Sequence, residues 1–282
     1  MLDEYTAKIK KKIDSFSARI GVCATYDNIK LFSYNENDEF DTACGIIAFV
    51  FLEYVRQIFL GILKPTDYLI YEEKNFATGA GVLKFLPFGS KIQVADVALL
   101  MVAASDHVAA NIMIDALGFN NINSTIRNFG FSKTKLLRKP LIPKVKNIGI
   151  SSPSDYTKFF SLLRKNCLIS SEASEYMKSI LLKQKYKDII SGKILESTKA
   201  SLFVDVASKS GKADGKMYDN KTNSYITDGG IVYTKKGNYE VSLFADIAAD
   251  DSLTMEVTKS FLQDISMEIF IGFCNDINQS EK

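Results

Sequence analysis

Four side chains in three separate segments carry the groups that acyl transfer needs. Cys44 offers a thiol nucleophile, Ser105 and His107 stand at the two ends of a Ser-Asp-His run, and Lys209 begins a Lys-Ser-Gly run. A nucleophile of this kind needs a neighbouring base to take its proton and donors to stabilise the charge that develops on the substrate. These segments lie 61 and then 104 residues apart, so only the fold can bring them together.

The two runs resemble signatures of the class A serine β-lactamases and their relatives among penicillin-binding proteins. That family carries S-x-x-K at a helix start, S-D-N after a helix and K-[ST]-G on a late strand. Ser105-Asp106-His107 and Lys209-Ser210-Gly211 match the second and third signatures in order and in spacing. The resemblance covers essentially the whole chain, through the segments ARIGVCATYDNIKLFSYNENDEF, GAGVLKFLPFGSKIQVADVALLMVAASDHVAANIMIDALG and VASKSGKADG.

The place of S-x-x-K is held by Cys-Gly-Ile-Ile at 44–47. The preceding run FDTAC matches the family without a gap, so the resemblance puts Cys44 at the nucleophile position and Ile47 at the lysine position. A shift by one residue would put Gly45 at the nucleophile position and would still leave no serine. Ile47 cannot accept a proton. A thiol ionises more readily than a hydroxyl, and a helix N-terminus and Lys209 would lower its pKa further. The alternative is that Cys44 is a small buried apolar residue.

The resemblance also implies a glutamate on the Ω-loop that activates the hydrolytic water. Between residues 116 and 154 the sequence has neither aspartate nor glutamate, so we expect no fast turnover through an acyl-enzyme. The corresponding loop, 132–150, is basic instead. It is interpreted as a solvated surface loop or as a contact for an anionic ligand. Its charged residues are Lys133, Lys135, Arg138, Lys139, Lys144 and Lys146.

Further roles follow from the resemblance alone. Ser105 would pass a proton to the leaving group. Lys209 would hold a substrate carboxylate, and Ser210 and Gly211 beside it would complete the binding strand. The backbone N–H of Cys44 and that of Lys212 would form an oxyanion hole.

His107, the only histidine of the chain, stands where the family has asparagine. Three roles are open to it. It could bind a ligand, pair with Cys44 as a thiol–imidazole couple, or fill the space of the asparagine as a neutral side chain.

Hydrophobic periodicity predicts the elements that must position these groups. The order is a helix, two strands, a long helical block, three strands and a final helix. The resemblance implies an α+β fold in which an α/β sandwich lobe (1–42 and 191–282) has a five-stranded antiparallel sheet and an all-helical lobe (43–190) is inserted, with a cleft between the lobes. The expected helices are 3–16, 43–61, 93–104, 108–117, one capped by Ser152, 171–184 and 251–273; the expected strands are 18–26, 28–35, 203–211, 224–234 and 239–248.

Composition excludes several classes of protein. The chain has 282 residues, 46% of them hydrophobic and 24% charged, with a net charge of +2, so we expect no nucleic-acid partner. Its cysteines are far apart and there is one histidine, so we expect no metal site and no cofactor, and a reducing compartment. These cysteines are Cys23, Cys44, Cys167 and Cys274.

The first 18 residues form a charged amphipathic pattern and not the apolar core of a signal peptide. The apolar run 46–63 is interrupted by Glu53, Arg56 and Gln57, which favours a buried helix over a membrane span. We therefore expect a cytoplasmic monomer, or an exported one if a leader has been removed. Its ligand would be a small or peptide-like molecule with a carboxylate.

Three functions remain open at this stage. The first is a family member with little or no β-lactam hydrolysis that retains a binding cleft for an acyl or peptide ligand. The second is a thiol-dependent acyl hydrolase or transferase that uses Cys44. The third is an active β-lactamase, as the family resemblance by itself would imply. The site must decide among them, because a fold does not fix a function.

Overall fold

A single antiparallel sheet built from both ends of the chain organises the structure, a computed structural model that describes residues 2–139, 147–217 and 221–280. The strand order is β2-β1-β11-β10-β8, and the short β9 also pairs with β10. The predicted α+β fold is confirmed, but the predicted strand 203–211 breaks into two pieces, with Lys209 and Ser210 in the gap. The strands are β1 (Arg19–Tyr26), β2 (Ile29–Tyr34), β8 (Phe203–Ser208), β9 (Gly211–Ala213), β10 (Ser224–Thr234) and β11 (Gly237–Ile247).

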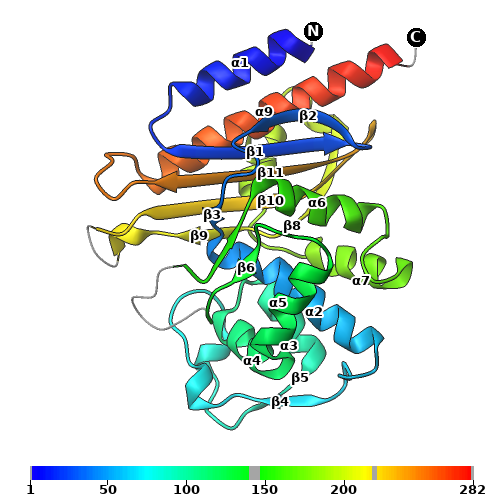
Figure 1. Ribbon diagram of the computed structural model, residues 1–282, viewed down its shortest axis with the longest axis vertical. Helices are drawn as coiled ribbons and strands as arrows, with labels where there is room; N and C mark the ends of the chain where they lie inside the picture. The colour runs from blue at the N-terminus through cyan, green and yellow to red at the C-terminus, as the bar shows by residue number, and fades with distance from the viewer. Residues whose placement is uncertain (1, 140–146, 218–220, 281–282) are drawn as a thin grey trace.

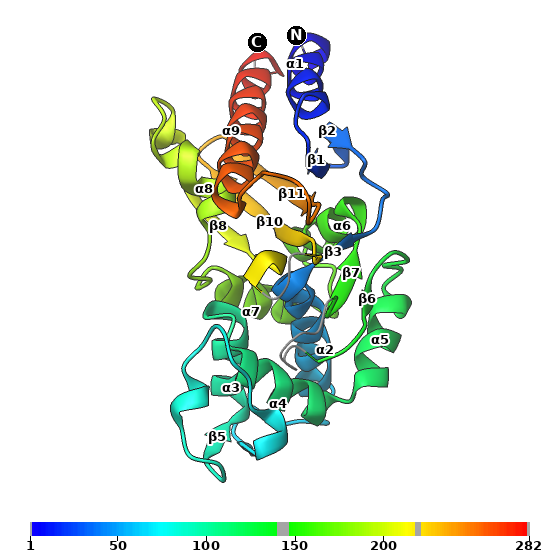
Figure 2. The same cartoon turned by 90° about the vertical axis from the view of Figure 1, so that its left-hand side faces the viewer.

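Helices from the two ends of the chain cover one face of this sheet (Figures 1 and 2). The first helix, α1 (Leu2–Asp14), lies beside the last, α9 (Met255–Ser280), and α8 (Asp188–Leu195) packs against α9. Their apolar side chains, Ile9, Leu262 and Ile265 among them, form one hydrophobic core with the sheet. Burial of these side chains is the main force that holds the terminal helices to the strands.

The opposite face of the sheet is covered by α6 (Pro153–Arg164), which contacts β1, β10 and β11. The predicted start of this helix is confirmed. The Ser152 hydroxyl accepts a hydrogen bond from the Asp155 N–H at 3.2 Å, and Pro153 occupies the first helical position, where no N–H is needed.

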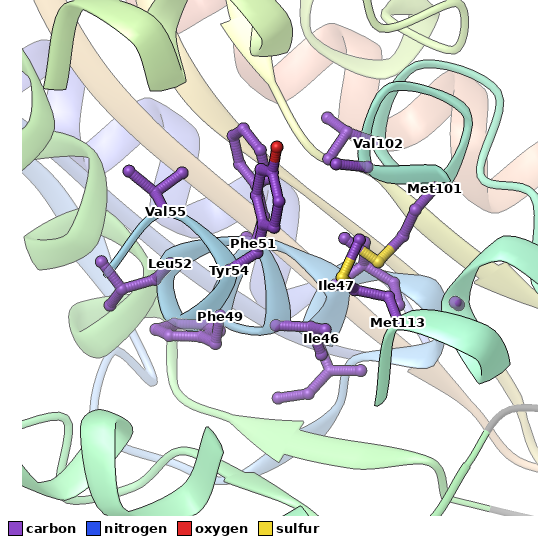
Figure 3. Close-up of a cluster of buried hydrophobic side chains, with 14 of the residues drawn as sticks. Ile46, Ile47, Phe49, Phe51, Leu52, Tyr54, Val55, Met101, Val102 and Met113 are labelled. Atoms are coloured by element: carbon purple, nitrogen blue, oxygen red, sulfur yellow. The ribbon is translucent and has the colours of Figure 1, made fainter. Parts of the chain in front are cut away.

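Helix α2 (Ile47–Phe59) runs through the centre of the helical part and is buried around most of its circumference, as Figure 3 shows for its apolar side chains. A helix that is apolar all round must be enclosed by others. The predicted helix at 43–61 is correct except in its first turn, 43–46, which is 3₁₀. The neighbouring helices are α3 (Val94–Ala103), α4 (His107–Leu117), α5 (Phe119–Asn128) and α7 (Ser171–Leu181).

Two helices were missed by the sequence patterns, and so were the short strands outside the main sheet. Helix α5 has the sequence FNNINSTIRN, whose asparagines and serine have low helix propensity, and α8 has only 8 residues. Helix α8 spans residues 190 and 191, where we expected the helical lobe to end and the α/β lobe to resume. It packs against α9 and β8. The division into two lobes stays a prediction.

A small three-stranded sheet lies where the chain enters α2. Strand β3 (Phe40–Asp41) pairs with β7 (Gly149–Ser151), which pairs with β6 (Lys135–Leu136). The basic segment between β6 and β7 contains Lys144 and Lys146, which lie outside the described residues. A separate two-stranded sheet pairs β4 (Tyr68–Ile70) with β5 (Lys91–Gln93). No helix in the described part of the chain is long and apolar enough to cross a membrane.

Candidate active site

Cys44 lies in the short 3₁₀ turn Ala43–Ile46 that leads into α2, and its side chain is half-buried. The preceding Ala43 has a φ of 43°, in the left-handed region that non-glycine residues rarely adopt. The Asp41 carboxylate holds this turn by accepting a hydrogen bond from the Ala43 N–H at 2.7 Å. The backbone around Cys44 is thus set by its neighbours, as expected for a site that must present one side chain.

The His107 imidazole lies directly against the Cys44 thiol. Its Nε2 is 3.1 Å from Sγ, and its Nδ1 is 3.0 Å from the carbonyl oxygen of Thr78. A carbonyl only accepts hydrogen bonds, so Nδ1 carries a proton and Nε2 faces the sulfur. Nε2 can therefore accept the thiol proton, and once protonated it donates to the thiolate. Of the three roles open to His107, the geometry is that of a thiol–imidazole couple.

The charges at this contact favour separation of the proton from sulfur. Burial raises the pKa of the Cys44 thiol, but the charge and hydrogen bond of His107 and the charge of Lys209 outweigh it, and the pKa lies below its ordinary value. Burial lowers the pKa of His107, yet the thiolate beside it and the bond to Thr78 raise that pKa to about 9. Both shifts favour the form of the couple in which Cys44 is a thiolate and His107 an imidazolium.

Lys209 is fully buried and faces Ser105. Its ammonium donates hydrogen bonds to the Ser105 hydroxyl at 2.5 Å and to the Ser210 carbonyl at 2.8 Å. Burial lowers the pKa of Lys209 to about 8. Ser105 itself has a φ of 49°, a strained conformation that turns its hydroxyl toward the lysine segment. The fold therefore brings the four predicted groups into two contacting pairs, Cys44 with His107 and Ser105 with Lys209. The charges of Lys209 and Cys44 also act on each other.

Asp106, the middle residue of the Ser-Asp-His run, holds this arrangement in place. Its carboxylate caps α4 by accepting from the Ala109 N–H at 3.0 Å, and it also accepts from the N–H groups of Val82 at 2.6 Å and Leu83 at 2.9 Å. It thereby ties the segment that contains Thr78 to the start of α4, where His107 is the first residue.

Gly211 allows strand β9 to lie against the turn that carries Cys44. A Cβ there would stand 2.3 Å from both the Thr42 oxygen and the Gly45 nitrogen, and 2.7 Å from the Cys44 nitrogen. Only glycine fits this approach. The close contact brings the backbone of β9, which includes the next residue, Lys212, beside the backbone of Cys44.

The other residues predicted for substrate binding are engaged within the protein. The Ser210 hydroxyl donates to the Tyr186 carbonyl at 2.9 Å. The Lys212 ammonium lies 3.9 Å from the Asp188 carboxylate. The binding roles of Lys209, Ser210 and Gly211, and the oxyanion hole formed by the backbone N–H groups of Cys44 and Lys212, stay predictions.

Two buried residues at the site carried no signal in the sequence pattern. The Tyr156 hydroxyl lies 2.9 Å from the Gly45 carbonyl and 2.8 Å from the Lys209 carbonyl, and so links the Cys44 turn to the lysine segment. Asp228 lies on β10 opposite the gap between β8 and β9, and its oxygens find no hydrogen-bond partner within the described residues. Burial raises the pKa of Asp228 to about 8. The sequence gives no reason to single out Tyr156 or Asp228, because their position at the site depends on contacts with segments far away in the chain.

Ile47, one turn after Cys44, is buried in the helical core. Its side chain is 2% exposed and lies with Met101 and Met113 in a cluster of buried hydrophobic side chains (Figure 3). In the loop 132–150, Lys139 pairs with Asp115, and Lys133 lies 3.7 Å from Glu39. The described residues contain no group of three or more side chains that could hold a metal ion.

Comparison with known proteins gives the same fold. A model of the beta-lactamase enzyme family matches residues 4–270. Beta-lactamase BRO-1 of Moraxella catarrhalis is 22% identical over 187 residues, which cover 64% of this chain and 60% of that protein. This match therefore spans less than two thirds of the curated relative.

Solved structures match over nearly the whole chain. The beta-lactamase of Sphaerobacter thermophilus DSM 20745 is 22% identical with a TM-score of 0.76, covering 95% of this chain and 94% of that one. The TLA-1 extended spectrum beta-lactamase is 15% identical with a TM-score of 0.83, covering 96% and 99%. PBP-A is 17% identical with a TM-score of 0.81, covering 96% of each chain. At these identities the likeness establishes the fold alone.

Proposed function

Because the chain belongs to the beta-lactamase enzyme family, we propose that it is an acyl-transfer enzyme of that fold in which the thiol of Cys44 is the nucleophile. Its substrate would be a small or peptide-like acyl compound that carries a carboxylate. In this proposal Cys44 replaces the family serine, Ile47 replaces the family lysine, and the imidazole of His107 takes over as base.

The contact of 3.1 Å between Cys44 Sγ and His107 Nε2 supports the proposal most directly. A buried structural cysteine needs no base, whereas here the imidazole is oriented by the Thr78 carbonyl so that its second nitrogen meets the sulfur. In known acyl-transfer enzymes a cysteine is activated in this way: the nucleophile is hydrogen-bonded to a base, and the base is hydrogen-bonded to a group that orients it. The alkyl side chain of Ile47 cannot take part in proton transfer. A serine at position 44 would therefore have only the imidazole of His107 as its base.

Acylation then follows from the positions of these groups. The Cys44 thiolate attacks the substrate carbonyl carbon, and the backbone N–H groups of Cys44 and Lys212 receive the developing negative charge on oxygen. The bond to the leaving group breaks, and the imidazolium of His107 supplies the proton that this group takes up. The Ser105 hydroxyl, hydrogen-bonded to Lys209, offers a second path for that proton.

β-Lactam hydrolysis by the route of the serine enzymes is expected to be negligible. The loop between residues 116 and 154 contains no carboxylate, and Ile47 cannot serve as base. A single general base contributes about 10²–10⁴ to a rate. Nitrocefin turnover at micromolar protein should therefore stay within about a hundredfold of the rate in buffer. A rate beyond that would contradict the proposal and support an active β-lactamase.

Intact mass spectrometry separates the three functions. The protein is incubated with penicillin G and, separately, with p-nitrophenyl acetate, next to a Cys44→Ala variant. We expect an adduct of the acyl group on the wild-type protein, absent from Cys44→Ala and mapped to the peptide that contains residue 44. Adducts that persist in Cys44→Ala would refute a thiol enzyme. The absence of an adduct with either reagent would also refute it, and would leave the alternative of a binding protein.

A further inference from the structure

The side chains of Lys209 and Ser210, which the resemblance assigns to a substrate carboxylate, already have partners within the protein. The Lys209 ammonium is fully buried and donates to the Ser105 hydroxyl and to the Ser210 carbonyl. The Ser210 hydroxyl donates to the Tyr186 carbonyl, and this residue is 3% exposed. A carboxylate that enters the site from solvent therefore meets neither group in an exposed and unpaired state.

Lys212 is an exposed cation on the same stretch of chain, next to the turn that carries the nucleophile. Strand β9 pairs with β10, and its Gly211 lies so close to the Cys44 turn that a Cβ there would stand 2.7 Å from the Cys44 nitrogen. The Cα of Lys212 is only about 3.8 Å further along the chain. Its flexible four-carbon stem lets the ammonium reach a ligand whose carbonyl group lies at Cys44.

The ion pair that holds Lys212 is loose. Its ammonium lies 3.9 Å from the Asp188 carboxylate, whereas the Lys259 ammonium lies 2.5 Å from the same group. Asp188, the first residue of α8, is therefore neutralised mainly by Lys259. The side chain of Lys212 is 36% exposed, and an exposed pair of this kind contributes little to stability. Lys212 can therefore leave Asp188 for another carboxylate at small cost.

We propose that Lys212 binds the carboxylate of the substrate and thereby selects anionic acyl compounds over neutral ones. This inference rests on the proposed acyl-transfer function and adds a specificity-determining side chain to it. Lys209 and Ser210 keep their internal hydrogen bonds, and Asp188 holds the Lys212 ammonium near the strand until a ligand arrives. The residue expected to contribute a backbone N–H to the oxyanion hole then also contacts the substrate through its side chain.

Alkylation of Cys44 by two related maleimides tests this role without requiring acyl transfer. N-Ethylmaleimide is neutral, whereas 3-maleimidopropionic acid carries a carboxylate at the end of its ethyl group. The rate of each reagent at Cys44 is divided by its rate at the exposed Cys167, and the quotient of the two relative rates is the preference for the anionic reagent. We expect Lys212→Gln to lower this preference about three- to fivefold, the range of an exposed ion pair.

Three further readouts identify the ammonium of Lys212 as the cause. Asp188→Asn removes the competing carboxylate, so the preference should rise. The difference between wild type and Lys212→Gln should largely vanish in about 1 M sodium chloride, which screens exposed charges. Lys216→Gln is the matched control, because the Lys216 ammonium donates to the carbonyls of Asp251 at 2.6 Å and Leu253 at 3.1 Å; this variant should keep the wild-type preference.

The same comparison in acyl transfer uses two esters. The rate of p-nitrophenol release with mono-p-nitrophenyl glutarate, which carries a carboxylate, is divided by the rate with p-nitrophenyl acetate, which does not. This ratio cancels any effect of the substitution on the nucleophile or on the oxyanion hole. We expect the ratio to fall in Lys212→Gln and to rise in Asp188→Asn, in parallel with the maleimide preference.

The outcomes separate this inference from the proposed function. If the maleimides label Cys44 but neither ester acylates it, the proposed function fails, and the maleimide preference alone decides the role of Lys212. A preference that is unchanged in Lys212→Gln would refute that role, and so would an equal fall in Lys216→Gln, which would indicate general surface charge. If neither maleimide reacts with Cys44 in the folded protein, the site is closed to such ligands and both proposals fail.

Discussion

Replacing His107 by asparagine tests the couple on which the proposed chemistry depends. Asparagine can fill the space at the start of α4 but cannot exchange a proton. A thiolate and an imidazolium 3.1 Å apart attract each other by about 5 kcal/mol at an effective dielectric constant of about 20. That figure is an upper limit, because the thiol is half-buried and water replaces part of the interaction. We therefore expect the pKa of Cys44 to rise by about two units, at about 1.4 kcal/mol per unit.

The rate of alkylation by iodoacetamide reports this shift. A rise of about two units lowers the thiolate fraction about a hundredfold at any pH below both midpoints. The more basic thiolate is also about six- to tenfold more nucleophilic, so the net slowing is about 10- to 15-fold. Peptide mapping after limited alkylation at several pH values gives the rate at each cysteine. The exposed Cys167 is an internal reference that the substitution should not affect.

The result that would refute the reasoning is an alkylation midpoint for Cys44 that is the same in His107→Asn and in the wild-type protein. In that case the imidazole does not stabilise the thiolate. Protection of Cys44 until the protein unfolds would also exclude a thiol nucleophile. In the folded wild-type protein, Cys23, whose pKa is raised by burial to about 12, and the buried Cys274 should react slowest of the four.

Three further substitutions have defined outcomes. Ile47→Lys, which places a charge in the apolar core, should lower the free energy of unfolding in urea by about 2–5 kcal/mol; a smaller loss would show that a polar partner is within reach. Folding raises the pKa of Asp228 from 3.8 to about 8, so the folded protein holds a proton that the unfolded chain loses over this range. Wild-type stability should therefore fall as the pH rises from about 4 to about 8, whereas Asp228→Asn should lack this slope and be the more stable at pH 8; parallel profiles would contradict this. Gly211→Ala should lower the melting temperature and slow alkylation of Cys44, because its Cβ would stand 2.3 Å from the Thr42 oxygen; unchanged values would mean that β9 can move away from the Cys44 turn.

The sequence was sufficient for the fold class, and it singled out residues that the structure brings into contact, Cys44 with His107 and Ser105 with Lys209. The runs that became β1, β10 and β11 are rich in apolar residues, which identifies buried strands, and the serine–proline start of α6 identifies a helix cap. Both signals are local, since they depend on residues a few positions apart. The Ser-Asp-His and Lys-Ser-Gly runs could be matched to a known family because motif order and spacing survive when single residues change.

The sequence left the role of His107 open among three alternatives, because nothing in the linear order relates residue 107 to residues 44 and 78. The tertiary structure decides the geometry by placing the imidazole between the Cys44 sulfur and the Thr78 carbonyl. Asp41, likewise, is one of many acidic residues until the fold buries it against the Cys44 turn, where it accepts the hydrogen bond of the Ala43 N–H. Contact across long separations and loss of water around a charged group are properties of the folded chain, and they set the pKa values on which the chemistry depends.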